Sequence, residues 1–241
     1  AVLMGIMGKA LVLVHEAVPG RGEQEVGTVG PALTGLGLDP LVTTLVGGGP
    51  AVPDLAEVAV LVVLGAAESA ADDTVPWLGA ELDLMRRAVA TGTPVLGICF
   101  GAQALARVLG GTVGRAPRSE RGFVALGSAA PDLLPAGEWL QFHDDAFTLP
   151  PGGQALASND VGLQAFAHGP HLGVQFHPEI TPAAFAAWVG SWEESGVAEV
   201  LAAEVDLPAL RADLVARSAA TEDACHDLVA RFATHAGVLV P

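Results

Sequence analysis

Cysteine is scarce in this sequence, and its scarcity excludes two ways of stabilising a fold. Of 241 residues only Cys99 and Cys225 are cysteines, which is too few for a disulfide scaffold and gives no zinc-binding spacing. The clusters His15-Glu16 and His143-Asp144-Asp145 are isolated, and no second motif completes a set of metal ligands. We therefore expect no metal site and no cofactor.

Basic residues and long apolar runs are also scarce. The chain has 11 Lys and Arg against 27 Asp and Glu, a formal net charge of −16, which disfavours binding to nucleic acid or to an anionic membrane. No run reaches the ~20 apolar residues of a membrane helix. The apolar stretch 1–14 lacks both a basic start and a clean cleavage site. We expect a cytoplasmic protein that binds neither nucleic acid nor membrane.

Apolar residues make up 51% of the chain, and their spacing alternates between strand-like runs and helix-like stripes. Strands are predicted at 9–15, 41–46, 58–64, 94–98 and 172–176. Helices are predicted at 25–36, 76–91, 102–109 and 182–192. This order predicts an α/β fold with an open, mainly parallel twisted sheet flanked by helices.

Two stretches depart from this alternation. Between 111 and 172 short runs are separated by Gly and Pro, which indicates an antiparallel or mixed extension of the sheet, with His168 and His171 in an exposed loop. After residue 192 the composition indicates helices that start near Asp206 and Thr221, with Cys225 as a small core residue. We expect one domain at 1–192 and a helical C-terminal extension at 193–241 that packs on it.

Cys99 lies where a predicted strand meets a predicted helix, with Gly97 two residues before it and Gly101 two residues after. This is the cysteine version of the Gly-x-Ser-x-Gly nucleophile elbow, whose sharp turn tolerates no side chain at the flanking positions. The turn would expose the sulfur at the helix N-terminus, where the partial positive charge favours a thiolate. A buried structural cysteine is the competing interpretation.

A thiolate nucleophile needs a base, and the base needs a group that orients it. His177-Pro-Glu179 supplies both at the end of another strand, provided that Pro178 makes a turn, because residues two apart on a straight strand share a face without touching. His143, which is followed by Asp144 and Asp145, is an alternative base. The pattern alone favours His177 without excluding His143.

Two separated motifs, Gly97-Ile-Cys-Phe-Gly-Ala-Gln103 and Val174-Gln-Phe-His-Pro-Glu179, resemble those of the class I (triad-type) glutamine amidotransferases. More narrowly, the chain is similar to the stand-alone GMP-synthase-like amidotransferases. That likeness also includes the runs 61–65, 142–147 and 150–152, and it covers roughly residues 10–192. The resemblance implies a flavodoxin-like α/β fold and hydrolysis of the side-chain amide of glutamine.

The resemblance also implies a role for each matching residue. Cys99 would form a γ-glutamyl thioester, His177 would move the proton to the departing ammonia, and Glu179 would orient His177. The backbone N–H groups of Phe100 and Ala66 would form the oxyanion hole. Gly65, Gln103 and His143 would lie at the substrate.

Two features differ from the family pattern. The oxyanion loop usually reads Gly-Gly-Pro and here reads Gly65-Ala66-Ala67, which would weaken the oxyanion hole if Ala66 needed a positive φ. No ATP-pyrophosphatase motif follows, so the ammonia would pass to a separate synthetase subunit or acceptor. Two alternatives remain open: hydrolysis of another small γ-glutamyl amide, and a non-catalytic regulatory domain with a degenerate oxyanion loop.

Overall fold

The computed structural model describes residues 8–16, 22–48, 52–195, 197, 201 and 204–238. A seven-stranded sheet organises this part of the chain, with the strand order β2-β1-β3-β4-β9-β8-β7. Five strands are parallel: β2 (Leu38–Thr43), β1 (Gly8–Leu13), β3 (Val58–Val63), β4 (Val95–Ile98) and β9 (His171–Val174). The strands β8 (Leu163–His168) and β7 (Gln154–Ser158) complete it in antiparallel pairing. The predicted open, mainly parallel α/β sheet is confirmed.

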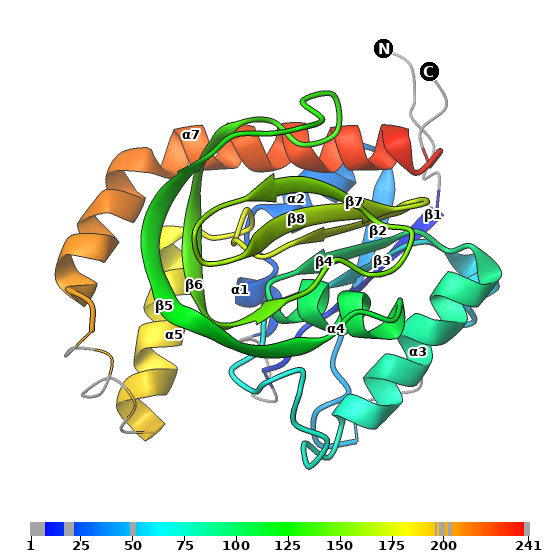
Figure 1. The fold of residues 1–241 in the computed structure, drawn as a ribbon, viewed down its shortest axis with the longest axis horizontal. Coiled ribbons are helices and arrows are strands. Elements are labelled where there is room, and N and C mark those ends of the chain that lie inside the picture. Colours follow the sequence, from blue (N-terminus) through cyan, green and yellow to red (C-terminus); the bar gives the residue numbers. More distant parts are fainter. Residues whose placement is uncertain are drawn as a thin grey trace.

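Helices cover both faces of this sheet (Figure 1). Because side chains alternate along a strand, Leu11 and Leu61 pack with α3 (Leu78–Thr91) and α4 (Phe100–Val108) in one core. Val12 and Val62 pack in the other core, with α2 (Val29–Gly35) and α7 (Leu207–His235). The remaining described helices are α1 (Gly22–Glu25), the 3-10 turn η1 (Leu55–Glu57) and α5 (Pro182–Ser195).

A long antiparallel ribbon, β5 (Val113–Leu126) with β6 (Gly137–Phe147), stands apart from the main sheet. The expectation of an antiparallel or mixed extension of the sheet at 111–172 is thus correct for β7 and β8, whereas the ribbon is antiparallel as expected but forms a separate sheet. The ribbon crosses the end of the sheet (Figure 1) and is tied to the core by Trp139, which stacks on Phe176 at a centroid distance of 4.5 Å. Its inner face therefore covers the region where β4 and β9 end.

The helical segments differ from the prediction in two places. The predicted helix 25–36 is divided between α1 and α2, because Gly27 adopts a φ of 50°. The two helices expected from Asp206 and Thr221 are a single helix, α7, capped by the Asp206 carboxylate on the N–H of Ala209. Thr221 bonds back to the carbonyls of the preceding turn, and no Gly or Pro interrupts 209–235, so the helix continues through it.

Two buried side chains test the remaining predictions about the core. Cys225 on α7 is fully buried, and burial raises the pKa of its thiol to about 12, which confirms it as an unreactive core residue. His171 is only 3% exposed, so the expectation of an exposed loop is wrong for it. It begins β9 and accepts a hydrogen bond from the N–H of Val95 on β4 at 3.2 Å.

None of the described helices is long and apolar enough to cross a membrane.

Candidate active site

Cys99 links the end of β4 to the start of α4 in a conformation that is unique in the described part of the chain. Its φ of 52° and ψ of −108° make it the single non-glycine residue there with a positive φ. Such backbone costs about 1–3 kcal/mol and persists where its surroundings fix it. Here the Cys99 N–H donates to Val174 O at 2.8 Å, and the Cys99 carbonyl accepts from Gln103 N at 3.0 Å. The strained turn places the sulfur beside the end of β9.

The flanking glycines are required by contact rather than by φ. A Cβ on Gly101 would lie 2.0 Å from Val63 O, and a Cβ on Gly97 would lie 2.5 Å from Gly101 O. Real Cβ atoms do not approach backbone oxygens so closely, so the helix start and β3 pack together only without these side chains. This confirms the steric reason for the elbow spacing.

His177 and Glu179 form a buried pair just beyond β9. Pro178 and Glu179 lie in a turn, as the sequence required, and His177 Nδ1 is 2.7 Å from Glu179 Oε1. The His177 N–H donates to Leu140 O at 2.8 Å, and Thr28 N donates to Glu179 O at 2.9 Å. The ribbon and the α2 entry thus hold the turn from two sides.

The second ring nitrogen of His177 is available for chemistry. Its Nε2 is buried and has no hydrogen-bond partner among the described residues. Burial lowers the pKa of His177, but the nearby charges of Glu179 and Cys99 and the hydrogen bond to Glu179 raise it well above 6.5. A protonated His177 beside Cys99 is the arrangement that stabilises a thiolate.

The loop after β3 lies directly against this pair. A Cβ on Gly65 would meet His177 Cε1 at 3.0 Å and Cys99 Cβ at 3.8 Å. Neither Gly65 nor Ala66 has a positive φ, so the Gly-Ala-Ala loop needs no conformation that alanine resists. No described residue accepts a hydrogen bond from the N–H of Ala66 or Phe100. Both predicted oxyanion donors therefore remain available.

Two glutamine side chains complete the surroundings of the sulfur. Gln175 Nε2 lies 3.6 Å from Cys99 Sγ, and Gln103 Nε2 donates to Gln175 Oε1 at 3.3 Å and to Asp145 O at 3.3 Å. Gln103 thus faces the interior and holds Gln175. Gln175 was not predicted to lie at the site, although it lies two residues before His177, a spacing that puts side chains of an extended chain on the same side.

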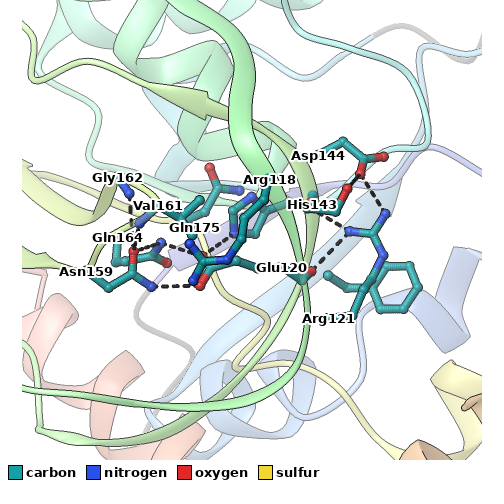
Figure 2. A network of polar contacts seen from close by, with 12 residues as sticks. Arg118, Glu120, Arg121, His143, Asp144, Asn159, Val161, Gly162, Gln164 and Gln175 are labelled. Atoms are coloured by element: carbon teal, nitrogen blue, oxygen red, sulfur yellow. Dashed lines mark hydrogen bonds and ion pairs between the residues drawn. The ribbon is translucent and has the colours of Figure 1, made fainter. Parts of the chain in front are cut away.

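His143 lies on β6 in a buried polar network (Figure 2). Its Nε2 is 3.0 Å from Glu120 Oε2 and its Nδ1 is 2.9 Å from Asp145 O. Gln164 and Asn159 donate to the same Glu120 carboxylate at 2.8 Å and 2.7 Å. Because both ring nitrogens of His143 are occupied, it has no nitrogen left to exchange a proton with Cys99. The geometry therefore favours His177 as the base.

A third buried histidine–carboxylate pair, His15 with Glu81, was not predicted. The side chains are 3% and 1% exposed and 3.0 Å apart. His15 is 66 residues from Glu81, and neither stands in a motif. A histidine directly after a buried parallel strand was the one available signal, since such strand ends face the site.

Comparison with known proteins identifies the family to which this chain is similar. Residues 44–188 match the family model described as "Glutamine amidotransferase class-I". The chain is 36% identical over 129 residues to GMP synthase (glutamine-hydrolyzing) of Thermosynechococcus vestitus, which covers 50% of this chain and 23% of that protein. It is 38% identical over 135 residues to the Mycobacterium leprae enzyme of the same name, covering 47% and 25%. The chain thus spans about a quarter of the length of these curated relatives.

Two solved structures match nearly the whole chain. A glutamine amidotransferase from Thermotoga maritima has a TM-score of 0.81 at 22% identity and covers 94% of this chain and 98% of its own. A glutamine amido transferase from Methylobacillus flagellatus has a TM-score of 0.79 at 26% identity and covers 96% of both chains. The first likeness shows the fold alone.

Proposed function

This chain belongs to the class I glutamine amidotransferase family, and we propose that it hydrolyses the side-chain amide of glutamine at Cys99. One observation carries the proposal. A cysteine on a strained strand-to-helix turn lies beside a buried histidine whose outer nitrogen is unpartnered and whose inner nitrogen is bonded to a carboxylate. This is the arrangement of an activated nucleophile, a base and an orienting group.

The reaction would proceed in two halves at these groups. The Cys99 thiolate attacks the amide carbon, and the negative charge moves to the amide oxygen, where the N–H groups of Phe100 and Ala66 donate to it. His177 Nε2–H gives its proton to the departing nitrogen, so ammonia leaves and a γ-glutamyl thioester forms. Neutral His177 then takes a proton from a water molecule while the oxygen of that water attacks the thioester. Glutamate leaves, and the Cys99 thiolate is restored. Glu179 accepts from Nδ1–H throughout.

The residues around the sulfur supply the substrate contacts in this proposal. Gly65, Gln103 and His143 remain the predicted substrate-binding positions, and Gln175 joins them because its amide is the side-chain donor nearest to Sγ among the described contacts. Gln103 and His143 are both bonded to Asp145 O, so one backbone carbonyl holds these two side chains next to each other.

We propose a separate protein as the ammonia acceptor. The relatives that carry the name GMP synthase (glutamine-hydrolyzing) are about four times as long as the segment that matches this chain, so most of their length lies outside the match. In this proposal the chain supplies ammonia to a synthetase subunit that binds and activates the acceptor.

Glutamate release from L-glutamine by the purified protein, compared with Cys99→Ala, tests the proposal. Turnover that disappears in the variant supports a self-sufficient glutaminase. Absence of turnover together with stoichiometric labelling of Cys99 by a glutamine-mimicking electrophile would replace glutamine with another γ-glutamyl amide or require a partner. Absence of both would contradict the proposed activity and favour a non-catalytic domain.

A further inference from the structure

His15 lies buried behind the loop that carries the predicted oxyanion donor Ala66. It follows β1, and its Nδ1 is 2.7 Å from the carbonyl oxygen of Gly65. Its Nε2 is 3.0 Å and 3.2 Å from the two carboxylate oxygens of Glu81 on α3. The ring packs against Trp77 and Phe100 at centroid distances of 4.8 Å and 4.9 Å. One ring therefore contacts Phe100, which is one expected oxyanion donor, and the Gly65 carbonyl, which belongs to the same peptide as the N–H of the other donor, Ala66.

Both hydrogen-bond partners of the His15 ring are acceptors. A neutral imidazole carries a single N–H and can serve only one of them. Bonding to the Gly65 carbonyl and to the Glu81 carboxylate together requires the His15–Glu81 pair to hold two protons. A buried imidazolium is tolerated only beside an opposite charge, and the Glu81 carboxylate supplies that charge.

The charged groups around His15 favour that form. Glu81 faces it from α3, and Glu25 of α1 accepts from its backbone N–H at 3.1 Å, with Glu16 next in the chain. Cys99 and His177 lie beyond Gly65. Burial lowers the pKa of His15, but Glu81, the Gly65 carbonyl and Glu25 raise it, and the balance is above 6.5.

His143 provides a contrast within the same fold. It too lies between a carbonyl and a carboxylate, but Glu120 already receives donors from Asn159 and Gln164. Burial lowers the pKa of His143, and the nearby His177 lowers it further. Among the described contacts, no donor other than His15 reaches the Glu81 carboxylate, so that carboxylate depends on the His15 proton.

The bond to Gly65 determines where the N–H of Ala66 points. The Gly65 carbonyl and the Ala66 N–H belong to one trans peptide, in which they point in opposite directions. With the carbonyl bonded to His15, the N–H faces away from His15. Glycine has wide backbone freedom, so the loop sequence by itself does not fix this orientation.

We propose that His15, supported by Glu81, is a positioning residue that holds the Gly65–Ala66 peptide with its N–H directed at the oxyanion formed on Cys99. This rests on the proposed amide hydrolysis. His15 does not touch the substrate in this role, and its effect on the reaction passes through the peptide.

The first test compares His15→Ala with His15→Asn. Loss of the anchor in His15→Ala is expected to lower kcat by about 100-fold, the cost of one oxyanion donor, with little change in KM. The asparagine amide can donate from the position of Nδ1–H, so His15→Asn is expected to recover most of that loss. Alkylation of Cys99 by iodoacetamide should be unchanged in both variants, because it needs the thiolate and no oxyanion hole.

The second test is Glu81→Gln, with Asp83→Asn as the matched control on the same helix. The glutamine amide can donate to Nε2 of a neutral His15, which keeps Nδ1–H on Gly65 and abolishes the titration of the pair. On the alkaline side of the pH profile, the fall of kcat should therefore depend on one ionisation fewer than in the wild type. The Asp83 side chain is 72% exposed and pairs only with Arg86 among the described residues, so its variant should keep the wild-type profile.

Nitrogen NMR of the His15 ring gives a readout that is independent of any substrate. Two protonated nitrogens are expected at neutral pH in the wild type, and one in Glu81→Gln. A singly protonated ring in the wild type, full kcat in His15→Ala, or a parallel fall in kcat and alkylation would overturn the role of His15. Missing wild-type turnover with a doubly protonated His15 would instead contradict the proposed substrate and leave the His15–Glu81 anchor standing.

Discussion

At the scale of single residues, the site depends on a backbone strain that neighbouring atoms hold in place. Cys99 keeps its positive φ because the N–H to Val174 and the close approach of α4 to β3 leave no alternative path for the chain. The strain of about 1–3 kcal/mol is therefore offset by contacts that exist only with glycine at 97 and 101.

Gly101→Ala tests this steric argument. The new methyl group would overlap the Val63 carbonyl, so unfolding free energy should fall by about 3 kcal/mol, with β3 and the elbow displaced. Gly79→Ala is the control, because Gly79 lies in α3 with no atom within 4 Å of a Cβ and should gain up to about 1 kcal/mol. Urea unfolding measures both. Equal stabilities would show that the elbow tolerates a side chain.

Glu179→Gln tests the electrostatic role of the buried carboxylate. The amide oxygen can still accept from His177 Nδ1–H, but the charge that raises the pKa of His177 is lost, so that pKa should fall. We expect kcat to drop by about 100-fold or more and alkylation of Cys99 by iodoacetamide to slow below neutral pH. Unchanged alkylation at every pH would show that Glu179 does not sustain the imidazolium–thiolate pair.

At the scale of elements, His171 joins the starts of β4 and β9. Burial, together with the nearby charge of His168, lowers its pKa to about 4. Folded His171 stays neutral as pH falls from 6.5, while the unfolded chain binds the proton. Its contribution is thus fully present above pH 6.5 and is lost towards pH 4, by at most about 3 kcal/mol.

His171→Asn measures this contribution. The asparagine Oδ1 can accept from Val95 N–H in place of Nδ1 but does not titrate. Between pH 6.5 and 4, the stability of the wild type should therefore fall more steeply than that of the variant in urea unfolding. Parallel curves would show that His171 is protonated in the folded protein as readily as in the unfolded chain.

The elements also show which features sequence patterns can predict. Apolar runs located the parallel strands and the elbow because burial on both faces leaves a continuous signal. The separation of the β5–β6 ribbon from the main sheet escaped prediction, since pairing partners 11 to 34 residues apart carry no local signature of the sheet that they form. The interior of α7 was misread at Thr221, where a residue that often caps helices bonds back to its own helix.

The site was predictable only to the extent that its chemistry lies within short motifs. Cys99, His177 and Glu179 stand in two such motifs, and the structure brings them together. His15 and Glu81 were not predictable as a pair, because it takes the folding of β1 against α3 to place them in contact. The residue types of a loop do not predict the direction in which one of its carbonyl groups points.

At the scale of the whole molecule, α7 belongs to two cores. Leu210 and Leu214 pack with α5 and the ribbon, whereas Leu228 and Phe232 pack beneath the sheet. The division into a domain at 1–192 and an extension at 193–241 stays a prediction. Shared cores make the two parts unfold together in this account.

Coincident unfolding transitions test that cooperativity. Far-UV circular dichroism reports the helices, of which α7 is the longest described, while fluorescence reports the four tryptophans, of which Trp77 and Trp139 lie in the two cores on either side of the sheet. We expect one urea transition with the same midpoint by both probes. An earlier loss of helical signal would show that the C-terminal helix is a separate unit.

The most direct test of the central claim is the covalent intermediate on Cys99. The protein is mixed with L-glutamine, quenched in acid within one turnover and digested. The mass of the peptide that carries Cys99 is then measured by mass spectrometry. The account predicts a γ-glutamyl adduct on that peptide which is lost on incubation at neutral pH and never forms in Cys99→Ala. Glutamate release without any adduct, and undiminished in Cys99→Ala, would contradict the account.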